Sequence, residues 1–284
     1  MSSVIRHDLM CADPEVAYRF YAELFGWQGL DVKIKGFEMK RLTLGERVVG
    51  AIVPFDQGAS WIPYMQVADV SACCHRVTEL GGDICIDPVS GPPGRYAVVN
   101  DPTEAVFSPF EPRTVPAWAA DAPPDNAFAW DQLITTDVDA ARAFYVELLG
   151  WTAHQVEGRS VLASDELPVA SIAVDQLRTA GARRVDREAP AWLPFIKVDE
   201  VDRVVRAALA LGGSLETEVD DDAVLGPIAV LRDPTGAVVG VGESLVVRIP
   251  ASQPEKRKRA SSIPITMPRA SRLANIRAVA TRRR

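Results

Sequence analysis

The chain has 284 residues, of which 48% are hydrophobic and 24% are charged, and its formal net charge is −7. This composition is typical of a folded globular protein and excludes a mainly disordered or fibrous one. No apolar run approaches the roughly 20 residues needed to cross a bilayer, and the first residues lack the pattern of a secretory signal. We therefore expect a cytoplasmic protein without a membrane partner.

The charge is unevenly distributed along the chain. Residues 1–250 carry 21 Lys and Arg against 37 Asp and Glu, whereas residues 251–284 carry 10 against 1. An acidic body argues against a nucleic-acid-binding surface on the folded part. The basic segment is rich in Ser, Pro and Arg, so we expect it to be mostly disordered, and we expect nucleic acid or another acidic partner to bind only there.

The main feature of the sequence is an internal repeat. Residues 13–27 recur as residues 137–151 with eight of fifteen positions identical, and residues 94–106 recur as residues 226–238. The chain is therefore a tandem duplication, and a site should be sought at equivalent positions in both copies.

The first repeated segment is predicted to be a helix in each copy. Asp13 and Asp137 stand at the N-cap position, and Gly26 and Gly150 follow the last turn. Apolar residues spaced i, i+3, i+4 and i+7 give each helix one buried stripe. Strands are predicted around these helices at residues 8–11, 37–44, 48–53 and 61–67, and at residues 132–135, 160–163, 169–174 and 192–198.

The same pattern restarts within each copy, because the strand near residue 61 or 192 leads into another helix that ends at Leu-Gly-Gly. Each copy is therefore predicted to contain two βαβββ units, which makes an α+β fold. The expected boundaries are a first domain over residues 4–111, a proline-rich linker over 112–127, a second domain over 128–247 and the basic tail over 251–284.

The four units, the Phe-Tyr-x-x-Leu-[Phe/Leu]-Gly-Trp helix ending, the Leu-Gly-Gly turn and the Asp-Pro-Thr-x-Ala-Val strand resemble the vicinal oxygen chelate superfamily. This superfamily includes glyoxalase I, bleomycin-resistance proteins and extradiol dioxygenases, and the resemblance covers residues 4–245. It implies that each pair of units curls its strands into an open cup that binds a ligand on its concave face. We further expect the two copies to pair within the chain as a pseudo-dimer.

In the metal-dependent members, the resemblance implies that a cup holds a divalent ion through four His, Glu or Gln ligands, one near the start or end of each unit. The matching positions here carry no imidazole or carboxylate. They are Arg6, residues 49–52, Ile62 and Ser108 in the first copy, and Trp130, residues 169–172, Leu193 and Gly240 in the second. Because divalent ions need such ligands, we expect neither a metal nor another cofactor.

Small shifts in this alignment leave an alternative open. A one-residue shift brings His7 or Asp131 to the first position, and a three-residue shift brings Glu111 or Glu243 to the last. The alternative is a metal-dependent lyase, isomerase or dioxygenase with displaced ligands.

Strand alternation places aromatic and polar side chains on the concave faces. The expected ligand-binding residues are Arg6, Asp8, Tyr64, Gln66, Ser108 and Phe110 in the first copy, and Trp130, Gln132, Phe195 and Lys197 in the second. These residues favour a metal-independent site for a small planar or aromatic molecule. If the protein is an enzyme without a metal, Asp8 is the best candidate for a general base.

Two other interpretations of the sequence remain. The same side chains could simply fill a closed core, and the body could be a degenerate scaffold whose basic tail binds an acidic partner. Trp27 and Trp151 are expected to be structural anchors. Cys73 and Cys74 are adjacent on a predicted helix, where their side chains point about 100° apart and cannot bind one ion.

Overall fold

The computed structural model describes residues 3–34, 37–115, 122–164, 167–174 and 190–249. The first copy contains β1 (Val4–Cys11), α1 (Pro14–Phe25), β2 (Gln28–Ile34), β3 (Phe37–Leu44), β4 (Arg47–Pro54), β5 (Ser60–Gln66), α2 (Val70–Glu79), β6 (Asp83–Gly91), β7 (Gly94–Asn100) and β8 (Val106–Pro112). The second contains β9 (Phe128–Thr135), α3 (Val138–Leu149), β10 (Thr152–Val156), β11 (Arg159–Ser164), β12 (Leu167–Val174), β13 (Ala191–Lys197), α4 (Val201–Ala210), β14 (Ser214–Asp222), β15 (Gly226–Arg232) and β16 (Val238–Gly242). All predicted strands are present, and β2 and β10, whose residues were not assigned from the sequence, complete the three strands that follow each repeated helix in its βαβββ unit.

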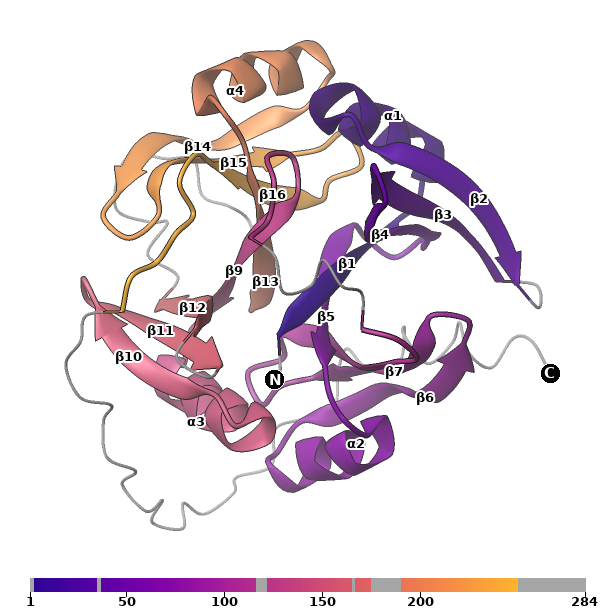
Figure 1. Cartoon of the computed structure of the whole chain (residues 1–284), viewed down its shortest axis with the longest axis vertical. Coiled ribbons are helices and arrows are strands. Elements are labelled where there is room, and N and C mark those ends of the chain that lie inside the picture. Colours follow the sequence, from indigo (N-terminus) through magenta and orange to yellow (C-terminus); the bar gives the residue numbers. More distant parts are fainter. Residues whose placement is uncertain (1–2, 35–36, 116–121, 165–166, 175–189, 250–284) are drawn as a thin grey trace.

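Each copy forms one eight-stranded mixed sheet. The strand orders are β2-β3-β4-β1-β5-β8-β7-β6 and β10-β11-β12-β9-β13-β16-β15-β14, so the two copies have the same topology. The two units of a copy join through the antiparallel pairs β1–β5 and β9–β13. Each sheet curls into a cup with its helices on the convex side (Figure 1). The predicted α+β fold with two domains is confirmed.

The repeated helices begin and end as their sequence predicts. The side chain of Asp13 accepts a hydrogen bond from the backbone N–H of Val16 at 3.0 Å, and Pro14 occupies the first turn. Gly26 and Gly150 both end their helices at a φ of 71°, a left-handed conformation that glycine adopts without strain.

The helix-covered faces of the two copies pack against each other. One core combines the first unit of the first copy with the second unit of the second copy, and another core combines the remaining two units. Accordingly α1 lies beside α4, and α2 lies beside α3 (Figure 1). The two copies therefore pair within the chain through their convex sides, which leaves the two concave faces directed away from this interface.

A buried hydrogen-bond chain joins the copies within the first of these cores. Tyr21 Oη donates to Asp233 Oδ2 at 2.9 Å, and Trp61 Nε1 donates to Tyr21 Oη at 3.1 Å. Tyr21 belongs to the repeated helix of the first copy, and Asp233 belongs to the Asp-Pro-Thr turn of the second. The two repeated motifs thus meet across the interface.

The equivalent chain is present in the other core. Tyr145 Oη donates to Asp101 Oδ2 at 3.0 Å, and Trp192 Nε1 donates to Tyr145 Oη at 3.0 Å. Burial raises the pKa of Tyr21 and Tyr145 well above the usual tyrosine range, so both phenols keep the proton that they donate. The repeated motifs therefore hold the pseudo-dimer together.

Trp27 and Trp151 reinforce the same interface. Each is buried and stacks on the tyrosine of its own helix, with interplanar angles of 16° and 22°. Trp27 Nε1 also donates to the backbone oxygen of Asn126 at 2.7 Å. Their predicted role as structural anchors is confirmed.

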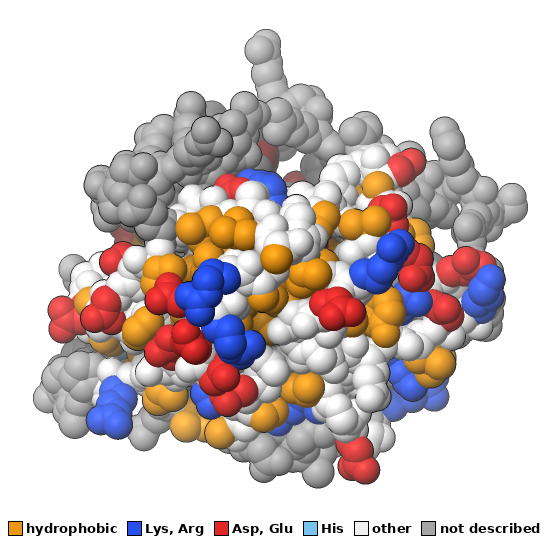
Figure 2. All heavy atoms as spheres, turned by 90° about the horizontal axis from the view of Figure 1, so that it is seen from above, with side chains coloured by type: hydrophobic (Ala, Val, Ile, Leu, Met, Phe, Trp, Pro, Cys, Tyr) orange, Lys and Arg blue, Asp and Glu red, His pale blue; other side chains and the backbone are white. Residues whose placement is uncertain are grey.

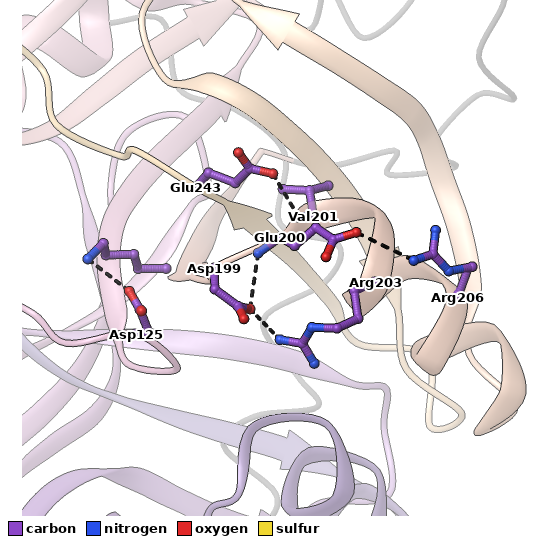
Figure 3. Close-up of polar contacts among 8 residues, drawn as sticks. Asp125, Asp199, Glu200, Val201, Arg203, Arg206 and Glu243 are labelled. Carbon is purple, nitrogen blue, oxygen red and sulfur yellow. Dashed lines mark hydrogen bonds and ion pairs between the residues drawn. The ribbon is translucent and has the colours of Figure 1, made fainter.

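The outer surface over α1 and α4 mixes charges of both signs. On α4, Arg203 pairs with Asp199 and Arg206 pairs with Glu200 (Figure 3). Figure 2 shows this face, where acidic and basic side chains alternate with small apolar areas. None of the helices in the described residues is long and apolar enough to cross a membrane. The predicted basic tail lies outside the described residues.

Candidate functional site

A row of side chains crosses the concave face of the first sheet. We call this face the first cup and the concave face of the second sheet the second cup. The register pairs Arg6 of β1 with Tyr64 of β5, and Tyr64 with Ser108 of β8. Paired residues project from the same face, whereas Leu9 projects into the core beneath α1. The predicted alternation is therefore correct for this strand.

A buried ion pair lies at the centre of the first cup. Arg6 Nη2 donates to Asp8 Oδ1 at 2.5 Å, and Arg6 Nε donates to the same oxygen at 3.2 Å. The two side chains are only 13% and 7% exposed. The guanidinium carbon of Arg6 also lies 4.9 Å from the centre of the Tyr64 ring, which gives a cation–π contact.

The electrostatics of this cluster fix its charges. Burial disfavours the charged form of Arg6, but the adjacent Asp8 carboxylate outweighs burial, and the pKa of Arg6 is raised. Burial and the charge of Asp8 also raise the pKa of Tyr64 well above the usual range, so its phenol is neutral. Since Arg6 engages the Asp8 carboxylate, the arrangement suits a charge-paired binding wall better than a free general base.

Three aromatic rings complete the first cup. The Tyr64 ring lies 5.7 Å from the Phe110 ring and 5.9 Å from the Tyr96 ring, centre to centre. The Arg6 side chain is 13% exposed and Tyr96 is half-buried, so a small part of this wall is accessible. The cluster thus offers one cation, one anion and aromatic faces.

The other predicted residues of the first cup are less accessible or peripheral. Ser108 is fully buried and donates to the backbone oxygen of Ala97 at 2.6 Å, so its hydroxyl serves the wall of the cup. Gln66 lies at the end of β5 and is half-buried. Tyr96, which the sequence reasoning did not select, belongs to the cup because β7 pairs it with Phe110.

The second cup has a different lining. Trp130 and Phe195 replace the pair Arg6 and Tyr64, and both are at most 3% exposed. The indole Nε1 of Trp130 donates to Ser171 Oγ at 3.2 Å, which satisfies it internally. Gln132 is also buried, in the place of Asp8.

Lys197, the last predicted residue, lies at the edge of the second cup. Its ammonium group pairs with Asp125 at 2.8 Å, and its backbone binds Ala127. This interaction holds the segment that precedes β9 against β13. Lys197 therefore contributes to packing at the rim rather than to the apolar wall.

The chain itself fills the second cup. Leu225, from the β14–β15 turn, is fully buried, and Leu245 and Val247, which follow β16, are 5% and 7% exposed. All three belong to one apolar cluster with Trp130 and Phe195. In the first copy, by contrast, residues 113–115 follow β8 and are exposed.

An ion pair crosses the edge of the second cup. Arg159 of β11 and Asp222 of β14 are 2.5 Å apart, and Asp222 Oδ1 also accepts hydrogen bonds from the backbone of Val224 and Leu225. Burial disfavours the carboxylate, but Arg159 and these N–H groups outweigh burial, so the pKa of Asp222 is lowered. The turn that supplies Leu225 is thereby held in place.

Neither cup has the ligand chemistry that the superfamily uses for a metal. Among the described residues, no three His, Cys, Asp or Glu side chains form a group suited to an ion. In the first cup, Asp8 is already bound by the guanidinium of Arg6, whose charge repels a divalent cation. In the second, the equivalent positions are Trp130 and Gln132. The described side chains of the two cups therefore do not fit the divalent ion of the metal-dependent members.

The four residues considered as displaced ligands have other partners. His7 Nε2 lies 2.7 Å from Asp131 Oδ1 at the interface between the copies. Glu243 accepts a hydrogen bond from the backbone N–H of Val201 at 3.0 Å and so caps α4 (Figure 3). The carboxylate of Glu111 caps α2 in the same way, at 3.3 Å. Each of these side chains therefore has a structural partner within the chain.

The structure also has a cleft of roughly 230 Å³ between the copies, which the sequence reasoning missed. It is lined by residues 3–7 of β1 and 127–131 of β9, together with the starts of β4 and β12. His7 and Asp131 lie here at equivalent positions of the repeat. Two residues at equivalent positions of a repeat can meet at the pseudo-twofold axis that relates the copies. A histidine and an aspartate at such positions were therefore a signal in the sequence for this contact.

Comparisons with known proteins agree with this architecture. The family model for a glyoxalase-like domain matches residues 127–241. The "Anthracycline biosynthesis protein DauV" of Streptomyces sp. (strain C5) is 30% identical over 260 residues, which cover 83% of this chain and 91% of that protein. The "Putative glyoxylase CFP32" of Mycobacterium tuberculosis is 29% identical over 246 residues, which cover 82% of this chain and 92% of that protein.

Solved structures share the fold at low sequence identity. The Mn(II)-bound glyoxalase from Novosphingobium aromaticivorans superposes with a TM-score of 0.59 at 14% identity, over 87% of this chain and 84% of that one. The 2,3-dioxygenase LapB from Pseudomonas sp. KL28 gives a TM-score of 0.63 at 11% identity, over 89% and 97%. The whole-length relatives, the family model over residues 127–241 and the four βαβββ units together show that the chain belongs to the vicinal oxygen chelate superfamily, with a glyoxalase-like second domain.

Proposed function

We propose that the protein binds a small planar or aromatic molecule in its first cup and that it does so without a metal ion. The observation that carries this proposal is the Arg6–Asp8 pair beneath Tyr64 and Tyr96, on the concave face that the superfamily uses for ligands. Aromatic faces stack on a planar ligand, and the accessible part of the guanidinium attracts an anionic or carbonyl oxygen.

The donor set of the first cup supports binding without a metal. A divalent ion in this cup would meet the carboxylate of Asp8, whose charge is already paired with that of Arg6, and it would be repelled by the Arg6 guanidinium. The nearby residues His7 and Glu111 are committed to the interface and to the cap of α2. Binding therefore rests on stacking and on charge-assisted hydrogen bonds. Metal-dependent lyase, isomerase or dioxygenase chemistry with displaced ligands is the weaker alternative.

The relatives favour the same class of ligand. Two curated relatives from Streptomyces are described as anthracycline biosynthesis proteins, and each is 30% identical to this chain. Anthracyclines contain planar fused rings that carry carbonyl and hydroxyl oxygens. Such a shape suits a wall of three aromatic rings with one cation.

Calorimetric titration with anthraquinone-2-carboxylate, a planar aromatic anion, tests the proposal. We expect one molecule to bind per chain and Tyr96→Ala to weaken binding roughly tenfold, because a stacking surface is lost. The matched control is Ile228→Ala, since Ile228 is the equivalent residue of β15 and faces the second cup. This control should bind the probe as the unmodified protein does.

A metal analysis tests the second part of the proposal. Purified protein should bind the probe equally well before and after prolonged treatment with a chelator. Stoichiometric Ni, Zn, Fe or Mn, whose removal abolishes binding, would overturn the metal-free site. Equal affinities for Tyr96→Ala and the unmodified protein would instead show that the ligand lies elsewhere.

A further inference from the structure

The second cup is filled by side chains that do not belong to its strands. Leu245 and Val247 pack against Trp130 and Phe195, yet they lie on a segment after β16 that forms neither helix nor strand. Val246 between them is 68% exposed, so the segment presents its apolar side chains to the cup and its other side to solvent. We define residues 243–248 as the plug.

A glycine creates the space that the plug occupies. Gly242 stands in β16 where Phe110 stands in β8, and a Cβ atom at Gly242 would lie 2.7 Å from Leu245 Cδ2. In the first cup the Phe110 ring fills this position from the strand itself. In the second cup the same position is open and receives a side chain from outside the sheet.

The plug has a strained backbone. Leu245 has a φ of 35°, close to the left-handed region that a leucine rarely adopts. Such a conformation costs free energy and persists only because its surroundings enforce it. Moreover, the corresponding residues of the first copy, Arg113 and Val115, are exposed. A sheet of this family can therefore fold without a plug.

The wall behind the plug defines the chemistry of a ligand. It is apolar, the indole N–H of Trp130 is satisfied by Ser171, and Lys197 at the rim is paired with Asp125. A charged ligand would lose its hydration there without a partner. The space taken by one leucine and one valine side chain matches an aromatic ring with a short substituent.

We infer that the second cup is a second ligand site, closed by the plug, and that an uncharged apolar or aromatic molecule binds there by displacing Leu245 and Val247. The plug and the ligand compete for the same wall. The apparent affinity of the ligand is therefore reduced by the fraction of molecules in which the plug is closed.

Hydrogen exchange on the unmodified protein tests displacement directly. With saturating ethylbenzene, the backbone amides of residues 245–248 should exchange faster, because the plug leaves the cup, while the amides of β1 and β5 in the first cup should not change. Benzoate, which has the same ring and a negative charge, should have no effect on the plug. Unchanged exchange of residues 245–248 at saturation overturns the inference.

Two glycine variants test the competition. The double variant Leu245→Gly/Val247→Gly removes the two plugging side chains and should bind ethylbenzene roughly tenfold more tightly than the unmodified protein. The control Val246→Gly/Arg248→Gly alters the same segment on its exposed side and should not change the affinity. Adding Gly242→Phe to the first double variant should abolish binding again, because the ring fills the wall as Phe110 does.

Far-UV circular dichroism and urea unfolding check that each variant is folded, and binding of anthraquinone-2-carboxylate reports separately on the first cup. If folded Leu245→Gly/Val247→Gly takes up ethylbenzene no more tightly than its control, the inference is wrong. Because the two probes address different cups, this failure is distinguishable from failure of the proposed function.

Discussion

The two cups of this protein have the same strand topology but opposite interiors. The first keeps a buried ion pair, Arg6–Asp8, beside aromatic rings of which Tyr96 is half-buried, whereas the second has Trp130 and Gln132 at these positions and is filled by the chain itself. The convex sides, by contrast, are nearly identical in their tyrosine, tryptophan and aspartate contacts. The duplication has thus preserved the interface between its copies and diversified the two concave faces.

This difference shows what the repeated motifs do. The residues that are identical in both copies, such as Tyr21 and Tyr145, join the copies, and their partners lie in the repeated Asp-Pro-Thr turns. Residues that differ between the copies, such as Arg6 and Trp130, line the cups. Identity between the copies therefore marks the scaffold, and the differences mark the candidate binding sites.

The largest expected effect comes from breaking the ion pair of the first cup. Arg6→Leu leaves the buried Asp8 carboxylate without its cation, and loss of one partner of a buried pair costs about 3–5 kcal/mol. Urea unfolding should therefore give a free energy of unfolding lower by about this amount. The double variant Arg6→Leu/Asp8→Leu should recover most of the loss, because no uncompensated charge remains.

A matched change at the rim of the second cup provides the control. Lys197→Leu breaks a pair whose aspartate, Asp125, is 52% exposed, and it should cost less than about 1 kcal/mol. If Arg6→Leu costs no more than Lys197→Leu, the charges of the first cup are solvated, and the contrast between the two interiors is smaller than we describe.

A smaller effect is expected from a buried polar contact in the wall of the second cup. Ser171→Ala removes the acceptor for the buried indole N–H of Trp130, and an unsatisfied buried donor costs about 1–2 kcal/mol. Thermal or urea unfolding measures this loss. Adding Trp130→Phe should not add a comparable penalty for an unpaired donor, so the two changes should be less than additive. Full additivity would show that the hydrogen bond contributes little.

The fold could be predicted from the sequence because its signals are local and occur twice. Asp13 and Gly26 fix the limits of α1, and their equivalents Asp137 and Gly150 fix those of α3. Strand alternation correctly placed Arg6 and Asp8 on the concave face, because a two-residue period leaves only two choices. The repeated motifs themselves identified the superfamily.

The filling of the second cup could not be predicted in this way. Leu245 and Val247 lie after the last strand, where no periodic pattern or turn signal applies, and their burial depends on a space created by Gly242. Leu225 belongs to a β14–β15 turn that is one residue longer than the β6–β7 turn of the first copy. Long-range packing of irregular segments decides such cases, and a single sequence does not encode it in a local form.

The smallest and most specific effect concerns pH and the ion pair at the edge of the second cup. The pKa of Asp222 is lower in the folded protein than its unfolded value of about 3.9, so its stabilising contribution is present above that value. As the pH falls through the folded pKa, the carboxylate is protonated and the contribution is lost. Asp222→Asn should therefore lower the free energy of unfolding by about 1 kcal/mol near pH 7, and the difference from the unmodified protein should shrink as the pH falls below about 3.9 toward the lowered folded pKa. A difference for Asp222→Asn that stays constant from about pH 7 to pH 3 would mean that the change acts through the turn that positions Leu225 and not through the charge.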